Sequence, residues 1–129
     1  MWPTLKNRRQ FDLVYSRGHK RTSQTLVVFL LDNAPDQRVA YVASKVVGGA
    51  VQRNRAKRLL RTAFRQAAGN RVMPRGWIVL VARSKIIEHK SQLVTRELTA
   101  LLADLEERGA EAPQRPRERG DRPRGKDAS

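Results

Sequence analysis

The feature that most constrains the fold of this chain is the segment GGAVQRNRAKRLLRTAFRQ, residues 48–66, which contains six Arg and Lys and no acidic residue. A helix turns by about 100° per residue, so this segment separates its basic residues from its apolar residues on two sides. The apolar side is formed by Ala56, Leu59, Leu60, Ala63, Phe64 and Ala67. Such a helix needs a sheet to cover its apolar side, and it leaves its basic side open to an anion.

The basic side is too uniform for an ordinary solvated helix surface. Four of its basic residues follow one another at intervals of four: Arg53, Lys57, Arg61 and Arg65. Like charges at this spacing destabilise a helix by about 0.2–0.5 kcal/mol per pair, so another requirement must select them. A planar guanidinium matches two phosphate oxygens, and Asn54, between Arg53 and Arg55, can both donate to and accept from a base edge or a 2′-hydroxyl. The pattern therefore predicts a nucleic-acid-binding surface.

The charge of the whole chain supports this prediction. Lys and Arg total 27 against 12 Asp and Glu, for a net charge of +15, and residues 37–87 contain twelve basic residues and no acidic one. Such an excess implies a polyanionic partner. The chain has no Cys, which excludes disulfides and thiolate metal sites. No apolar stretch near the N-terminus suits a signal peptide, and runs such as LVVFLL are too short to span a membrane, so we expect a cytoplasmic protein.

The apolar periodicity of the chain predicts an α+β sandwich, in which helices pack on a small mixed sheet. The expected order is helix, strand, strand, helix, strand, helix, over residues 4–17, 25–32, 38–45, 48–68, 76–84 and 91–109. The first two strands are expected to pair as a hairpin, with Thr4 as the cap of the first helix and Gly18 at its end. A short extra strand over residues 19–22 also fits. We divide the chain into one folded domain, residues 1–108, and a disordered Arg- and Pro-rich tail, residues 109–129.

Two interpretations fit the glycine pair at the start of the basic helix. The backbone amides of Gly48 and Gly49 could cradle a phosphate, or the pair could form a turn that lets a strand meet the helix. Because the Lys-Ser or Lys-Thr pair of a P-loop does not follow these glycines, we favour the turn.

The residues from Ser44 to Phe64, SKVVGGAVQRNRAKRLLRTAF, closely resemble the signature of the protein component of bacterial ribonuclease P. The hallmark of that family is an Arg-Asn-Arg core followed by Lys-Arg and by another Arg one turn on. The matching positions are Lys45, Gly48, Ala50, Val51, Arg53, Asn54, Arg55, Lys57, Arg58 and Arg61. Upstream, the matching positions are Leu5, Phe11, Tyr15 and Gly18. The resemblance covers residues 4–106, so residues 1–108 are expected to form a ribonuclease P protein-like RNA-binding domain.

The resemblance implies both a fold and a function. In the family, the basic helix links two parallel strands by a left-handed crossover, against the usual right-handed preference. The protein is a subunit of an endoribonuclease whose catalytic RNA, with bound Mg²⁺, hydrolyses the phosphodiester between the 5′ leader and the tRNA. The expected partners are therefore ribonuclease P RNA and precursor tRNA, without a small-molecule substrate or a membrane. Neither catalytic nor metal-binding residues are expected in the protein, because the RNA subunit and the substrate hold most of the Mg²⁺.

The resemblance also implies two binding surfaces. The surface for the catalytic RNA is expected to comprise Lys45, Arg53, Asn54, Arg55, Lys57, Arg58, Arg61 and Arg65. A cleft for the 5′ leader is expected between the first helix and the sheet, with Phe11, Tyr15 and Phe29 at its aromatic positions. Bases stack on aromatic rings with little sequence preference, which suits a protein that accepts many leaders. Taken singly and on sequence alone, each of these three residues is better explained as ordinary core.

Two positions depart from the family pattern. In the family, a second Lys often follows the position of Lys45, and a polar residue often follows the position of Gly48. Here these positions hold Val46 and Gly49, which removes one phosphate contact.

Other functions stay open on the sequence alone. The Arg-Asn-Arg signature argues against a structural RNA-binding protein of the ribosomal kind. The sequence shows no dimerisation element, which argues against a DNA-binding module. A membrane-surface helix would need a bulky Trp and Leu side, which the basic segment lacks. A catalytic site within the protein is disfavoured. His19 is expected in an exposed loop, and neither it nor His89 belongs to a set of residues spaced as metal ligands. The carboxylates that acid-base catalysis would need avoid the basic region.

Overall fold

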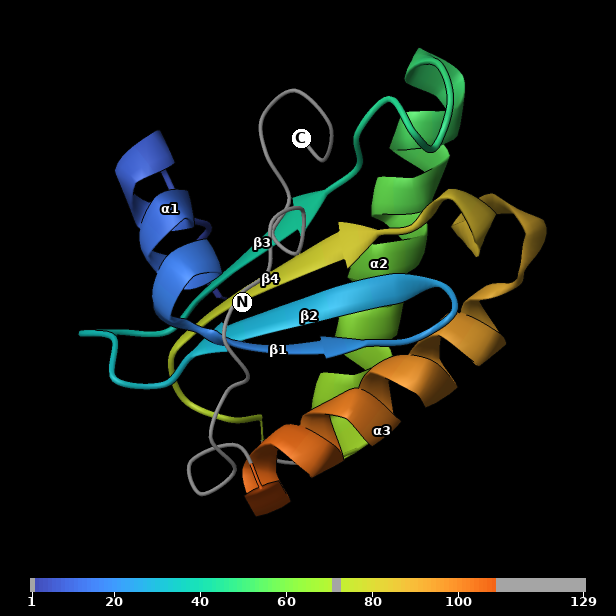
Figure 1. Cartoon of the computed structure of the whole chain (residues 1–129). Coiled ribbons are helices and arrows are strands. Elements are labelled where there is room, and N and C mark those ends of the chain that lie inside the picture. Colours follow the sequence, from blue (N-terminus) through green and yellow to red (C-terminus); the bar gives the residue numbers. More distant parts are fainter. Residues whose placement is uncertain (1, 71–72, 109–129) are drawn as a thin grey trace.

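The structure is a computed structural model that describes residues 2–70 and 73–108, and the tail predicted over residues 109–129 lies outside this part (Figure 1). Within the described residues, one sheet is covered by three α-helices. The helices are α1 (Arg8–Arg17), α2 (Ala50–Asn70) and α3 (Ser91–Arg108), with a short 3-10 helix η1 (Ser84–Glu88) before α3. α1 packs on one face of the sheet, and α2 and α3 pack on the other. The predicted α+β sandwich of three helices and a mixed sheet is confirmed.

The strands are β1 (His19–Thr22), β2 (Leu26–Leu31), β3 (Arg38–Val42) and β4 (Trp77–Ala82). Their order across the sheet is β1-β2-β4-β3, with β2 antiparallel to β1 and β4, and β3 parallel to β4. The short extra strand is thus confirmed, but the predicted hairpin between β2 and β3 is wrong, because β4 lies between them. All six residues of β4 are buried. A strand that is buried on both faces belongs in the middle of a sheet, where neighbours on both sides pair its backbone.

α2 connects the parallel neighbours β3 and β4 by a crossover. In Figure 1 both strands point to the upper right, β4 lies on the right of β3 along this direction, and α2 lies behind the sheet. This crossover is left-handed, as the resemblance implied, although such units are usually right-handed. The face that α2 covers decides the handedness, because a right-handed path would bring α2 onto the face that α1 occupies.

Alternate residues of the central strands build two cores, one on each face of the sheet. In β2, Val28 and Leu30 face α2 and α3, whereas Phe29 and Leu31 face α1. β4 alternates in the same way. The unbroken apolar runs of these strands are what a sheet covered on both faces requires. The two predicted binding surfaces, one on α2 and one beside α1, therefore belong to opposite faces of the sheet.

The chain before α1 does not form the predicted first turn of the helix. Asn7, and not Thr4, caps α1, because the Asn7 side-chain oxygen accepts a hydrogen bond of 3.0 Å from the Gln10 N–H. The preceding residues run beside the edge strand β3, where the Val39 N–H donates to the Pro3 carbonyl at 2.9 Å. This hydrogen bond holds the N-terminal segment against β3, and the helix starts only at Arg8.

His19 lies half-buried at the start of β1, and not in the exposed loop predicted for it. Its Nε2 lies 3.6 Å from an Asp32 carboxylate oxygen, and its buried Nδ1 has no hydrogen-bond partner among the described residues. Gly18, just before it, ends α1 as predicted. A Cβ at Gly18 would lie 2.5 Å from the Val14 carbonyl oxygen, so only glycine lets α1 meet β1 this closely.

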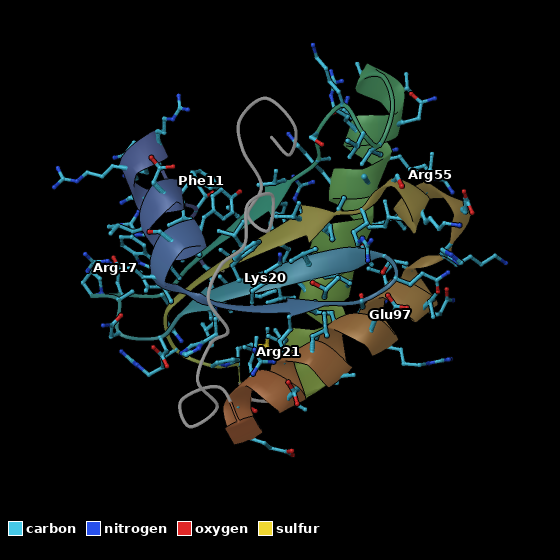
Figure 2. All side chains as sticks on the ribbon, viewed as in Figure 1. Phe11, Arg17, Lys20, Arg21, Arg55 and Glu97 are labelled. Atoms are coloured by element: carbon cyan, nitrogen blue, oxygen red, sulfur yellow. The ribbon has the colours of Figure 1, made fainter. Side chains whose placement is uncertain are left out.

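A carboxylate on α3 holds the loop between β1 and β2 (Figure 2). A Glu97 carboxylate oxygen accepts hydrogen bonds from the Ser23 hydroxyl at 2.8 Å, the Thr25 N–H at 2.9 Å and the Thr25 hydroxyl at 2.6 Å. Burial alone would raise the pKa of Glu97, but the hydrogen bonds donated by Thr25 and Ser23 outweigh it and lower the pKa below its ordinary value. The ionised carboxylate of Glu97 therefore connects α3 to the β1-β2 hairpin by hydrogen bonds.

We expect Glu97→Ala to lower the free energy of unfolding by about 1–3 kcal/mol at neutral pH, because the donors of Ser23 and Thr25 lose their acceptor. Glu97→Gln keeps an oxygen acceptor and should cost less.

Folding lowers the pKa of Glu97, so the contribution of its ionised form to stability is complete above the unfolded pKa of about 4.3 and is lost as the pH falls through the folded pKa. The stability difference between the wild type and Glu97→Gln should therefore shrink in acid. Urea unfolding at neutral pH and at about pH 3 measures this, and the exposed Glu107→Gln is the control. The same pH response in both Gln variants would contradict the role of Glu97.

Candidate nucleic-acid interface

α2 has the two sides that its sequence predicts. Its buried residues are Ala56, Leu60, Ala63, Phe64 and Ala67, which belong to the core between the sheet, α2 and α3. The helix runs from Ala50 to Asn70, so it begins and ends two residues later than predicted. One side of α2 is therefore anchored in the core, and its position on the sheet fixes where the other side points.

The opposite side of α2 is basic and open to solvent. Its exposed residues are Asn54, Arg55, Arg58, Arg61 and Arg65, and Arg53 and Lys57 are half-buried. Arg55 projects from the N-terminal half of the helix (Figure 2). α2 contains no acidic residue, and no ion pair within residues 2–70 and 73–108 involves its Arg and Lys side chains. These charges are therefore available to a polyanion.

The turn before α2 carries Lys45 and is held in place by Arg53. The Gly48 N–H donates to the Lys45 carbonyl at 3.1 Å, and the Arg53 guanidinium donates to the Gly48 carbonyl at 3.1 Å. Gly48 has a φ of +139°, which an L side chain rarely adopts. The turn interpretation is therefore confirmed for Gly48. Lys45 is exposed in this turn, next to the N-terminal end of the basic side.

A cluster of aromatic rings flanks the basic side at the edge strand β3. Tyr41 is half-buried, and the guanidinium carbon of Arg61 lies 5.4 Å from its ring centroid. Phe64 meets Tyr41 and Trp2 edge-on, at centroid distances of 6.1 and 5.3 Å. Burial raises the pKa of Tyr41, and the charges of Arg61 and Arg65 oppose this only in part. Tyr41 and Trp2 were not predicted here, because the pattern of residues does not reveal which strand lies beside the basic side of α2.

The three aromatic residues predicted to bind the leader lie together but differ in exposure. The ring centroids of Phe11 and Tyr15 are 6.2 Å apart, and Tyr15 meets Phe29 edge-on at 4.9 Å. Phe11 is half-buried, Tyr15 is 8% exposed and Phe29 is fully buried. The prediction that Phe29 contacts a ligand is therefore corrected, because it is a core residue beneath Tyr15. Burial, with a smaller effect from the Asp12 carboxylate, raises the pKa of Tyr15 to about 12, so this phenol stays neutral.

Basic side chains accompany Phe11 on the α1 side of the sheet. The exposed ones on α1 and just before it are Lys6, Arg8, Arg9 and Arg17. Figure 2 shows Phe11 on the side of α1 that faces the sheet, with Lys20 of β1 on the same face. The Lys20 Nζ lies 5.9 Å from the Phe29 ring centroid. These basic residues were not singled out from the sequence, although their number in and near α1 was the available signal.

Neither a metal site nor a membrane span is found in the described part of the chain. These residues contain no group of three or more His, Asp or Glu side chains that could hold a metal ion. The buried Nε2 of His89 has no hydrogen-bond partner within the same residues, and His89 belongs to no such group. No helix in residues 2–70 and 73–108 is both long enough and apolar enough to cross a membrane.

Comparison with known proteins agrees with this geometry. The sequence profile of the Ribonuclease P family matches residues 3–106. The chain belongs to the ribonuclease P protein family. The ribonuclease P protein component of Nitratiruptor sp. is 41% identical over 105 residues, covering 81% of this chain and 94% of the relative. That of Dehalococcoides mccartyi is 36% identical over 100 residues, covering 76% of this chain and 80% of the relative.

Solved structures of ribonuclease P proteins share the fold. The protein from Thermotoga maritima is 32% identical and has a TM-score of 0.65, over 77% of this chain and 94% of that one. The protein from Staphylococcus aureus has a TM-score of 0.66 at 24% identity, over 80% of this chain and 94% of that one. Ribonuclease P proteins act in the processing of the tRNA 5′ leader together with an RNA subunit, as the protein component of an endoribonuclease.

We expect Gly48→Ala to lower the free energy of unfolding by about 1–2 kcal/mol, because the backbone conformation of Gly48 disfavours an L side chain. The added Cβ would also lie 2.8 Å from the Gln52 Cβ. Gly49→Ala is the matched control, since a Cβ there would meet only the Gln52 Oε1, at 3.3 Å. Urea unfolding of both variants tests this difference, and equal losses would show that the turn does not depend on Gly48.

Proposed function

We propose that this chain is the protein subunit of a ribonuclease P holoenzyme that removes the 5′ leader of precursor tRNA by endonucleolytic hydrolysis and so generates the mature tRNA 5′ end. The observation that carries the proposal is the exposed, acid-free basic side of α2, on a chain that matches the family over residues 3–106. A surface of this kind has little use except to bind a polyanion, and the family restricts that polyanion to RNA.

The basic side of α2 is the proposed surface for ribonuclease P RNA. Its members, with the preceding turn, are Lys45, Arg53, Asn54, Arg55, Lys57, Arg58, Arg61 and Arg65. Guanidinium groups can each take two phosphate oxygens, and Asn54 can bond to a base edge or a 2′-hydroxyl. Arg53 also donates to the Gly48 carbonyl, so it holds the turn that presents Lys45. Most of the affinity should come from the release of counterions from RNA phosphates.

The α1 side of the sheet is the proposed surface for the 5′ leader. Phe11 is the aromatic residue that a base can reach, and Tyr15 and Phe29 support it from the core. Stacking on an aromatic ring contributes about 1–3 kcal/mol per base with little sequence preference. The exposed basic residues of α1 and Lys20 can hold leader phosphates. Because α1 and α2 cover opposite faces of the sheet, the protein can hold leader and catalytic RNA at the same time.

The chemical step is proposed to belong to the RNA subunit. When bound by the RNA subunit and the substrate, Mg²⁺ would activate water as the nucleophile and stabilise charge on the phosphate. The residues of the protein bind the leader, orient the scissile phosphodiester toward the catalytic RNA and reduce the repulsion between two polyanions. The twelve acidic residues of the chain avoid residues 37–87, so the basic surface adds no negative charge of its own.

The proposed place of action is the cytoplasm. A chain without Cys has no need of an oxidising compartment, and the proposed partners are two RNAs, ribonuclease P RNA and precursor tRNA.

Reconstitution tests the proposed function directly. A precursor tRNA with a 5′ leader is incubated at low Mg²⁺ with bacterial ribonuclease P RNA alone, with this protein alone and with both. We expect cleavage at the mature 5′ end only when both are present, because at low Mg²⁺ the protein supplies the charge that brings the two RNAs together. If the protein has no effect on cleavage by the RNA, the structural RNA-binding function replaces this proposal.

The salt dependence of binding tests the role of α2. If the basic side contacts about six or more phosphates, the affinity for ribonuclease P RNA should fall by about a thousandfold between 50 and 200 mM salt. Arg58→Gln and Arg65→Gln should each reduce the slope of log affinity against log salt by about 1. Arg96→Gln, on the exposed surface of α3, is the matched control and should leave the slope unchanged. A nearly flat response of the wild type would contradict phosphate binding by α2.

A further inference from the structure

Arg61 differs from the other exposed arginines of α2 because it rests on an aromatic ring. Its guanidinium carbon lies 5.4 Å from the centroid of the Tyr41 ring, while its side chain as a whole is exposed. Within the described residues, Arg55, Arg58 and Arg65 have no such contact with a ring. Arg61 therefore has an aromatic ring on one side of its guanidinium, while the side chain as a whole stays exposed to solvent.

The Tyr41 ring that supports Arg61 is itself held in place. Phe64, which is 6% exposed, meets Tyr41 edge-on with an interplanar angle of 76° and meets Trp2 edge-on with an angle of 78°. Tyr41 also belongs to β3, whose backbone pairs with the central strand β4. A ring packed in this way loses little further freedom when a ligand binds, so the orientation of the guanidinium above it is set in advance.

The chemistry of a guanidinium on a ring suits a nucleobase. A guanidinium is planar, delocalised and weakly hydrated, so it stacks through its faces and donates hydrogen bonds through its edge. RNA-binding proteins stack unpaired bases on aromatic rings and on guanidinium planes. The neighbours of Arg61 one turn away on each side are Lys57 and Arg65, which can take the phosphates that flank such a base. A phosphate would bind the N–H edge of the guanidinium and leave its open face unused.

We propose that Arg61, supported by Tyr41, stacks on an unpaired nucleobase of the RNA bound to α2, and that Tyr41 is a positioning residue of this interface. The inference rests on the proposed function, in which α2 binds ribonuclease P RNA, and it adds that the bound element contains an unpaired base. The edge of the sheet beside α2 is then part of the RNA-binding surface, together with the helix itself.

The test measures the affinity of the full chain for bacterial ribonuclease P RNA over a series of salt concentrations. Tyr41→Leu removes the supporting ring without changing any charge, Tyr41→Phe keeps the ring, and Arg61→Lys keeps the charge without the plane. We expect Tyr41→Leu and Arg61→Lys each to weaken binding about tenfold with an unchanged salt slope, and Tyr41→Phe to bind as the wild type does. The double variant Tyr41→Leu with Arg61→Lys should be little worse than either single variant, because both remove the same stack.

Several outcomes would overturn the proposal. Wild-type affinity in Arg61→Lys would mean that the positive charge alone suffices for binding. Because Arg61 is exposed, this variant should fold normally and give a clear result even if Tyr41→Leu is destabilised. A weaker affinity of Tyr41→Leu with a salt slope reduced by about 1 would mean that Arg61 binds a phosphate. If the wild type itself does not bind the RNA, the proposed function fails first, and the stacking proposal fails with it. A loss of affinity in both single variants with an unchanged salt slope, while wild-type binding and reconstitution succeed, would sustain both proposals.

Discussion

The packing of α2 on the sheet is the interaction on which the rest of the structure depends. Full burial of a Leu or Phe side chain stabilises a fold by about 1.5–3 kcal/mol, and α2 buries Leu60 and Phe64 together with three alanines. Against this, like charges four residues apart cost about 0.2–0.5 kcal/mol per pair, and the series from Arg53 to Arg65 contains only three such pairs. Burial therefore outweighs repulsion, and the helix can keep an unneutralised basic side because its inner side is anchored.

This anchor also gives the molecule two distinct faces, and each carries one of the two proposed RNA-binding surfaces. α2 and α3 occupy one face of the sheet, so α1 covers the other, and the fully buried strand β4 lies between the two cores. The aromatic and basic residues around Phe11 are thereby separated from the basic side of α2 by the thickness of the sheet. A small domain can then hold two RNA segments without bringing their phosphates together, which suits a subunit that works between a substrate and a catalytic RNA.

Much of this architecture could be predicted from residue patterns, because the signals were local. The two sides of α2, the buried strands, the extra strand from His19 and the turn at Gly48 all follow from periodicity or from backbone requirements within a few residues. The wrong predictions concern contacts between distant segments. Thr4 is a good cap by type, but its segment lies against β3, and β4 comes between two strands that looked like a hairpin.

The aromatic residues show most clearly where sequence reasoning ends. Phe11, Tyr15 and Phe29 have similar side chains, yet only Phe11 keeps an accessible ring, because burial depends on what packs above each residue. In the same way, the support of Arg61 by Tyr41 arises because the edge strand lies beside the helix, although the two residues are far apart in the chain.

The sequence by itself determined that this protein has a helix with one apolar and one basic side, an α+β fold and the signature of the ribonuclease P protein family. Those properties depend on residue type and spacing within single segments. The tertiary structure decided the strand order, the handedness of the crossover, which aromatic rings stay accessible and which arginine rests on a ring. These properties depend on which segments share a face of the sheet, and that choice is made by burial of the whole core and not by any one segment.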